Sequence, residues 1–245
     1  MRLIIIPDVH GCLNQLENLI KFLEGEGYLN DRKLAMLGDY IDRGPQIRAM
    51  INFCIELQKD GHILICGNHE FALERALYGP TGWAATWFDN YEDRLLESFG
   101  LSAYLYYNGL EKKAAIDLYQ AMTLAEREFI ANLPLYYEDE HFVLVHAALL
   151  DSLSWEEQKS SLDTWDREQA EVPPQLRKRT LTLPPGFKKC LVTGHDPRRQ
   201  PLITKNRVAL DLAVFSSGKL PAWIPDANLI VTISHNEIWV DTALP

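Results

Sequence analysis

The first third of the chain alternates between short apolar runs and longer amphipathic segments, and this order limits the folds open to it. Apolar runs at residues 3–6, 34–37 and 63–66 predict three strands. The segments that begin at Leu13 and at Ile47 repeat their apolar residues at helical spacing. A β-α-β-α-β order implies parallel strands that are buried on both faces and joined by right-handed crossovers. We therefore predict an α/β fold.

Polar residues directly follow each of these predicted strands. Asp8, Asp39 and Asn68 each lie just past the end of one of them. In an open sheet of parallel strands, ligands bind at the carboxyl ends of the strands. We therefore expect these three side chains to meet at one edge of the sheet.

The second half of the chain consists of shorter strand-like runs with turns between them. These runs lie at residues 142–145, 190–193, 201–204, 208–212, 229–233 and 237–240. They predict a second, largely antiparallel sheet that packs on the first, with helices outside. The double prolines at 173–174 and 184–185 are interpreted as loop punctuation. We therefore treat residues 1–245 as a single catalytic domain.

A helical insert is expected at about residues 71–134, between the two halves. One interpretation makes it a cap over the active site, and the simpler one makes it a helical subdomain with its own small core. The stretch is rich in aromatic residues, which include Trp83, Trp87, Phe88, Tyr91, Phe99, Tyr104 and Tyr107.

Charge and apolar content exclude several classes of function. The formal net charge of −10 argues against a protein that holds nucleic acid through its phosphates. An anionic substrate then needs a local positive site, which bound metals provide. We expect no signal peptide, no membrane span and a cytoplasmic location, because no apolar run is long enough. The four cysteines have neither zinc spacing nor the density of a disulfide framework.

Three short segments and two later histidines carry residue types that bind divalent metals. They are Asp-Val-His-Gly at 8–11, Gly-Asp-Tyr-Ile-Asp-Arg-Gly at 38–44, Gly-Asn-His-Glu at 67–70, and the separate residues His146 and His195. Sites that hydrolyse phosphoryl groups commonly hold two cations, with a carboxylate and a water bridging them. Asp8 and His10 can bind the first ion and Asp39 can bridge. Asn68, His146 and His195 would complete the second.

Three further residues of these segments suit phosphoryl transfer. Arg43 can grip two phosphate oxygens through its planar guanidinium. His69 is the candidate acid that protonates the leaving oxygen, and Asp42 would orient His69 and favour its protonated form. The expected reaction is direct attack on phosphorus by a hydroxide that bridges the metals.

As a set, the segments resemble the phosphoprotein phosphatase family of metallophosphoesterases, in its bacterial and bacteriophage-lambda branch. The resemblance extends from Ile4 to about Leu220. It implies a four-layer α/β/β/α sandwich, in which two mixed sheets are flanked by helices. It also implies two divalent metal ions, with Mn²⁺ first and iron or zinc as alternatives.

Matched residue by residue, the resemblance implies the same ligands and adds phosphate-binding residues. Asn68 would serve both the second metal and the phosphate, beside Arg43. A second arginine on phosphate usually follows a tryptophan in this family, and Arg167 after Trp165 fits that pattern. One departure is the segment at 210–213, which lacks the family's common Thr-Gly pair.

A finer comparison within the resemblance favours one class of substrate. Bacterial hydrolases of diadenosine tetraphosphate resemble this chain but typically lack the counterpart of Asp42. We therefore expect a dinuclear-metal protein phosphatase that acts on phosphoserine and phosphothreonine, with phosphotyrosine as a further substrate. The alternative is a symmetrical diadenosine tetraphosphate or nucleotide hydrolase. A third hypothesis is a non-catalytic regulatory protein that retains the fold for binding, and the oligomeric state stays open.

Overall fold

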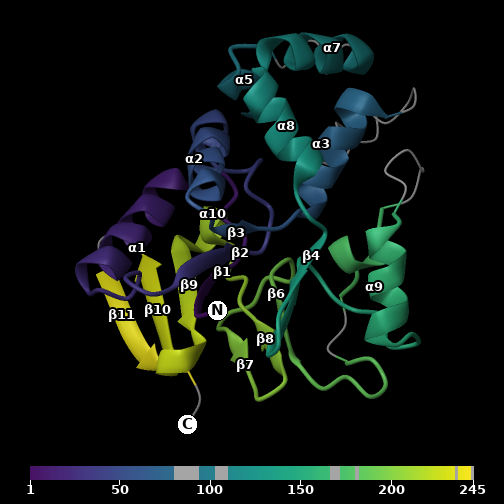
Figure 1. Ribbon diagram of the computed structural model, residues 1–245. Helices are drawn as coiled ribbons and strands as arrows, with labels where there is room; N and C mark the ends of the chain where they lie inside the picture. Colours follow the sequence, from purple (N-terminus) through teal and green to yellow (C-terminus); the bar gives the residue numbers. More distant parts are fainter. Residues whose placement is uncertain (80–93, 103–109, 166–171, 180–181, 235–236, 244–245) are drawn as a thin grey trace.

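The computed structural model describes residues 1–79, 94–102, 110–165, 172–179, 182–234 and 237–243 (Figure 1). Its strands form two mixed sheets with helices outside. The first sheet has the order β11-β10-β9-β1-β2-β3 and the second the order β4-β5-β6-β8-β7. The predicted α/β class with two helix-flanked mixed sheets is confirmed. No helix in these ranges is both long and apolar enough to cross a membrane.

The predicted β-α-β-α-β unit forms one half of the first sheet. Its strands β1, β2 and β3 run parallel, and the helices α1 and α2 join them (Figure 1). Both helices bury the apolar face that their spacing predicts. The bounds are β1 Leu3–Ile6, α1 Leu13–Gly25, β2 Lys33–Met36, α2 Ile47–Lys59 and β3 Ile63–Leu64.

The other half of the first sheet corrects the sequence prediction. The runs near 229–233 and 237–240 form β10 and β11, and they extend the first sheet rather than the second. The strand β9, which the sequence analysis did not predict, joins β10 to β1 through antiparallel pairs. The bounds are β9 Lys219–Ile224, β10 Leu229–Ser234 and β11 Glu237–Thr242.

The second sheet is mixed rather than largely antiparallel, which is a second correction. Its central pairs, β5 with β6 and β6 with β8, are parallel, and only the outer strands β4 and β7 run antiparallel to their neighbours. A parallel pair needs a long crossover, and the connection from β5 to β6 includes the helix α9. The bounds are β4 Tyr136–Glu138, β5 Phe142–Val145, α9 Trp155–Asp163, β6 Cys190–Thr193, β7 Leu202–Ile203 and β8 Arg207–Ala209.

The strand β1 contributes to both layers of the core because its side chains alternate between the two faces of the sheet. Ile4 and Ile6 belong to a large cluster that includes the buried residues of α1 and α2. Leu3 and Ile5 belong to a smaller cluster with Leu144 and other residues of the second sheet. The two sheets therefore pack face to face.

The described helices of the insert share the main core rather than forming a separate one. Buried residues of α5, α7 and α8 belong to the same cluster as those of α2. Thr123 and Glu126 form a capping box at the start of α8, and Arg48 of α2 contacts the same glutamate at 2.8 Å. The bounds are α3 Asn68–Tyr78, α5 Arg94–Ser98, α7 Glu111–Ala121 and α8 Leu124–Asn132. Of the aromatic residues singled out above, only Phe99 lies within the described residues.

Candidate metal centre

The predicted metal ligands and His69 converge from the segments that follow five different strands. Asp8 and His10 follow β1, and Asp39 follows β2. Asn68 and His69 form the first turn of α3, after β3. His146 follows β5 and His195 follows β6, so both sheets contribute to one site. The expected meeting at the carboxyl ends of the strands is found.

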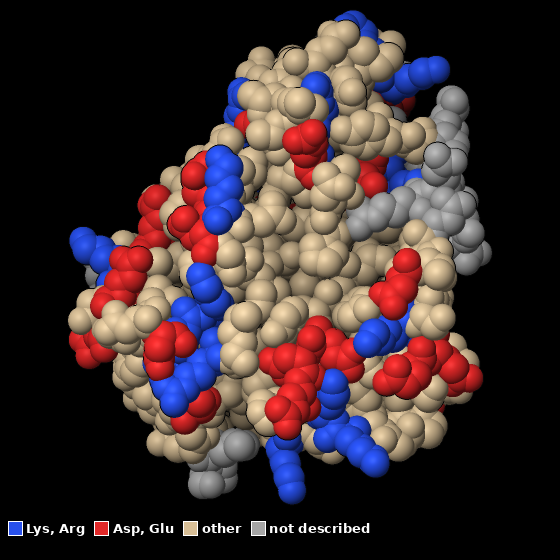
Figure 2. Space-filling model, in the orientation of Figure 1, with Lys and Arg blue, Asp and Glu red and all other residues tan. Residues whose placement is uncertain are grey.

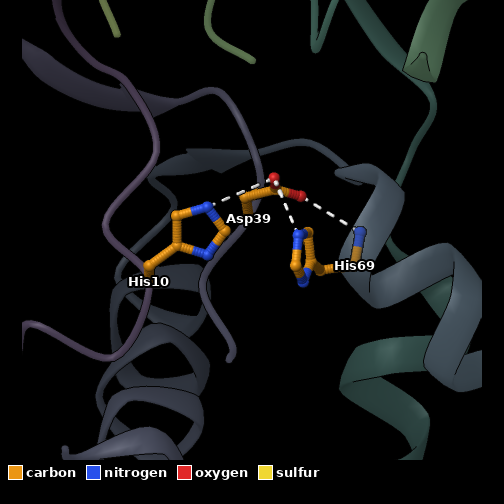
Figure 3. A group of neighbouring side chains, drawn as sticks. All are labelled: His10, Asp39 and His69. Carbon is orange, nitrogen blue, oxygen red and sulfur yellow. Dashed lines mark hydrogen bonds and ion pairs between the residues drawn. The ribbon is translucent and has the colours of Figure 1, made fainter. Parts of the chain in front are cut away.

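Asp39 lies at the centre of this arrangement. Its Oδ2 atom is 3.5 Å from Nε2 of His10 and 3.8 Å from Nε2 of His69 (Figure 3). The same atom is 3.3 Å from Nε2 of His146. Two groups of side chains have their donor atoms within 4.8 Å of one another: His10, Asp39, His69 and Asp39, His146, His195. Because Asp39 belongs to both groups, the donors suit two neighbouring cations bridged by one carboxylate.

The imidazoles are oriented as metal ligands commonly are. Nδ1 of His10 lies 2.8 Å from the carbonyl oxygen of Ile41, and Nδ1 of His146 lies 2.8 Å from that of Leu37. A carbonyl only accepts, so each Nδ1 carries a proton and each Nε2 faces the site, where it can bind a cation through its lone pair once it carries no proton. Nε2 of His146 also lies 3.2 Å from Nδ1 of His195. Oxygen and imidazole nitrogen donors at this spacing fit divalent cations such as Mn²⁺, Fe²⁺ or Zn²⁺.

Asp8 and Asn68 lie beside these groups, and the grouping differs in part from the ligand set expected from sequence. The Asp8 carboxylate accepts the backbone N–H of His195, at 3.1 Å to each of its oxygens. Oδ1 of Asn68 lies 2.9 Å from Nε2 of His146. The third member of the group with His10 and Asp39 is His69, whereas Asp8 was expected there from the sequence.

The backbone of the site lies repeatedly in the left-handed region. Non-glycine residues with positive φ include His10 at 40°, Asp39 at 53°, Asp42 at 65°, Arg43 at 64° and His195 at 62°. Such conformations cost on the order of 1–3 kcal/mol each and persist only where the surroundings enforce them. The clustering of strain at the predicted residues supports a functional role for them.

Glu70 holds the strained loops in place, a function that the sequence analysis did not assign to it. Its buried carboxylate accepts the backbone N–H groups of Gly67, Asp39, Tyr40 and Ile41, at 2.8–3.2 Å. Burial and the neighbouring Asp39 raise the pKa of Glu70 to about 7. Its place at the end of the Gly-Asn-His-Glu segment was the one sequence feature that could have indicated this function.

Two glycines are required by close approach to the acidic residues. A Cβ atom at Gly67 would collide with Oδ1 of Asp39, and one at Gly194 would collide with Oδ1 of Asp8. The glycines therefore let the chain pass against the two carboxylates that the sequence analysis placed on metals.

The charge states of the buried groups depend on one another. Burial lowers the pKa of His10 and of His195 to about 3, which leaves both rings neutral, as ligands must be. Burial would also lower the pKa of His146, but Asp39 and Asp8 outweigh it and raise that pKa to about 10. A cation at the site would take the place of the proton on His146.

Arg43, His69 and Asp42 lie together at one end of the site. Nδ1 of His69 is 2.6 Å from Oδ2 of Asp42, while Oδ1 of Asp42 is buried without a hydrogen-bond partner among the described residues. The guanidinium of Arg43 places Nη1 at 2.9 Å from Nε2 of His10 and Nη2 at 3.3 Å from Nε2 of His69. Arg167 lies outside the described residues, and Trp165 before it packs against the main core.

Among the described residues, the charged side chains on the face seen in Figure 2 form no basic surface that would attract an anionic substrate. Basic and acidic side chains are interspersed over it rather than separated by sign. With a formal net charge of −10, attraction for a phosphate has to come from the site itself.

Comparison with known proteins agrees with this geometry. The sequence profile of the family described as calcineurin-like phosphoesterase matches residues 1–231. A relative from Oceanobacillus iheyensis, named bis(5'-nucleosyl)-tetraphosphatase PrpE [asymmetrical], is 25% identical and is aligned over 96% of this chain and 93% of its own length. A relative of the same name from Bacillus thuringiensis is 27% identical over 91% of this chain and 89% of its own.

Solved structures share the fold. A putative diadenosine tetraphosphatase matches with a TM-score of 0.59 and 17% identity, over 96% of this chain and 95% of its own. A cold-active protein tyrosine phosphatase matches with a TM-score of 0.61 and 17% identity, over 98% and 78%. A serine/threonine phosphatase from Saccharomyces cerevisiae matches at 0.59 and 12%, over 97% and 81%. The match to residues 1–231, together with the Asp39-centred donor groups, shows that the chain is a metal-dependent hydrolase of the calcineurin-like phosphoesterase family.

Proposed function

We propose that this phosphoesterase hydrolyses dinucleoside polyphosphates at a phosphoric anhydride bond. The similarity to proteins named bis(5'-nucleosyl)-tetraphosphatase carries the proposal, because it extends over nine-tenths of this chain rather than over the metal motifs alone. From the sequence, this activity ranks second to protein dephosphorylation because Asp42 is present. The relatives reverse that order, and their names favour asymmetrical rather than symmetrical cleavage.

Two cations, with Mn²⁺ first and iron or zinc as alternatives, fit the two donor groups. When bound there, they would lower the pKa of water and neutralise charge on the phosphoryl oxygens. His10 would hold the first, Asp39 both, and His146 with His195 the second. Asp8 and Asn68 complete the proposed set of ligands. Asp8 lies beside the backbone N–H of His195, and Asn68 lies beside the ring of His146.

The remaining polar residues bind phosphate and move a proton. Nη1 and Nη2 of Arg43 lie beside His10 and His69, respectively. From there their N–H groups can bind phosphate oxygens. Asn68 and Arg167 are proposed to share that task. His69 would donate the proton from Nε2 to the leaving oxygen, since its Nδ1 is held by Asp42 at 2.6 Å.

Protein dephosphorylation is the second candidate, and the contact between Asp42 and His69 favours it. The alkoxide of serine or threonine is a far more basic leaving group than a nucleotide phosphate, so it gains more from an assisted acid. A buried carboxylate 2.6 Å from the imidazole is suited to that task.

The test compares kcat/KM for diadenosine tetraphosphate and for a phosphothreonine peptide in one manganese buffer, with Asp39→Asn as the control without a bridging carboxylate. We expect a higher value for the dinucleotide and loss of both activities in the control. A preference for the peptide would establish the second candidate instead. A protein that binds manganese but hydrolyses no phosphoester, p-nitrophenyl phosphate included, would support the third hypothesis, a regulatory binding protein.

A further inference from the structure

The described chain places one aromatic side chain directly beside the proposed phosphate-binding arginine. The Cζ atom of Arg43 lies 4.7 Å from the centroid of the Phe215 ring, within the range of a cation–π contact. The same ring packs nearly at right angles to the ring of His10, with centroids 5.4 Å apart and planes at 88°. We infer that Phe215 is a positioning residue, which holds the guanidinium of Arg43 in the orientation that binds phosphate.

The local chain fixes the position of Phe215. Phe215 lies in the short helix α10, Val214–Ser217, directly after Ala213, whose φ of 52° is left-handed. Oδ1 of Asp211 accepts the N–H of Ala213 at 2.7 Å and stabilises that turn. The neighbouring Val214 is buried and anchors the helix to the main core. These contacts set the direction in which the next side chain, Phe215, leaves the helix.

Burial does not account for this placement. The Phe215 side chain is 39% exposed, whereas the core phenylalanines Phe71 and Phe129 are 0% and 4% exposed. A partly exposed ring gains less from the hydrophobic effect than a buried one. Its contacts with Arg43 and His10 are then the feature that distinguishes it.

Arg43 has a need for such support. Its side chain has several rotatable bonds, and an unsupported guanidinium loses this freedom when it binds an anion. Phe215 covers the guanidinium, while Nη1 and Nη2 point toward the histidines of the site. The ring therefore restricts the side chain and leaves its N–H groups on the side of the guanidinium that faces the site.

This inference rests on the proposed role of Arg43 but not on the choice between dinucleotide and phosphopeptide. Its test can therefore use p-nitrophenyl phosphate as the substrate and inorganic phosphate as the competing ligand. Phe215→Leu removes the aromatic face at similar volume, and Phe215→Tyr retains it. Tyr119→Leu is the matched control, because Tyr119 is 38% exposed and lies 4.2 Å from Arg127 in a similar contact of the insert.

We expect Phe215→Leu to raise KM and the inhibition constant of phosphate by roughly tenfold, with a smaller fall in kcat. Phe215→Tyr should restore both constants, and Tyr119→Leu should leave them unchanged. Combined with Arg43→Ala, the leucine substitution should add nothing, because both changes remove the same interaction. In the metal-free protein, the ring should also shift the Arg43 Nε–H proton resonance, and Phe215→Leu should abolish that shift.

Three results would overturn the inference. One is an effect of Phe215→Leu that Phe215→Tyr does not restore, and another is an effect that adds fully to that of Arg43→Ala. The third is an unchanged inhibition constant in Phe215→Leu when Arg43→Ala weakens phosphate binding. If Arg43→Ala itself leaves phosphate binding intact, the proposed role of Arg43 fails together with that of Phe215.

Discussion

Nδ1 of His69 and Oδ2 of Asp42 lie 2.6 Å apart, and both side chains are buried. The other ring nitrogen of His69 faces Oδ2 of Asp39 at 3.8 Å. This geometry offers His69 two roles, as the acid that protonates the leaving group or as a ligand of the first metal. The two roles make different predictions for one substitution.

For His69→Asn we predict a loss of catalysis without a loss of metal. Removing a general acid typically lowers kcat by about 10²–10⁴-fold. The loss should be larger for a phosphothreonine peptide than for a dinucleotide, since the alkoxide depends more on a proton. Metal content measured by plasma mass spectrometry should match that of the wild type. A protein that lost one equivalent of metal would identify His69 as a ligand instead.

For Glu70→Gln we predict a loss of stability and of metal affinity together. The amide would replace one acceptor oxygen of the carboxylate with a donor that faces backbone N–H groups. Leaving buried donors unpaired costs about 1–3 kcal/mol each, so the free energy of unfolding should fall by several kcal/mol. Urea denaturation and manganese titration measure the two effects. Glu17→Gln, at an exposed position of α1, is the control and should change neither.

For Gly194→Ala we predict weaker metal binding, because the added Cβ would displace the Asp8 carboxylate. A ligand that binds only the folded state raises its melting temperature, so manganese should stabilise the wild type much more than this variant. Gly25→Ala is the matched control, since nothing lies within 4 Å of its added Cβ and it ends the helix α1. A melting temperature of Gly194→Ala that rises with manganese as in the wild type would contradict the place given to Asp8.

Glu138 lies away from the metal centre, and its lowered pKa makes the free energy of unfolding depend on pH. Burial alone would raise its pKa, but hydrogen bonds from Lys159, Lys189 and Trp155 outweigh it and lower the pKa to about 2. The ordinary value is 4.5, so the carboxylate stabilises the fold above about pH 4.5 and this contribution is lost as the pH falls toward 2.

Glu138→Gln should therefore lower the free energy of unfolding by about 1–2 kcal/mol at pH 6 and flatten its pH dependence between 4.5 and 2. Urea unfolding at a series of pH values measures this, with Glu140→Gln at an exposed position nearby as the control. An unchanged slope in the Glu138 variant would show that the three hydrogen bonds do not persist in solution.

The sequence predicted those parts of the fold and the site that depend on short-range pattern. The run Leu3–Ile6 could be identified as a buried strand because all four residues are apolar. Asp39 could be placed near His10 because parallel strands carry the residues after them to a common edge. His146 and His195 were added from motif context, and the structure brings both within reach of Asp39.

The pairing of the C-terminal strands could not be predicted because it depends on contacts distant in sequence. The strand β9 contains Pro221, which argues against a strand in an apolar run. In the structure, β1 pairs with β9 only at Ile5 and Trp223, so Pro221 does not have to donate a hydrogen bond to β1. Two contacts of the site could not be predicted for the same reason. Glu70 supports Asp39 from 31 positions away, and Phe215 contacts Arg43 from 172 positions away.

Cleavage of a dinucleoside polyphosphate at the Asp39-centred site is tested most directly through the products it forms. Diadenosine tetraphosphate would be incubated with the manganese-loaded protein, and the nucleotides separated by anion-exchange chromatography, with Asp39→Asn in parallel. We predict equal amounts of AMP and ATP from the wild type and neither from the variant. An intact dinucleotide, in a preparation that hydrolyses p-nitrophenyl phosphate, would contradict the account.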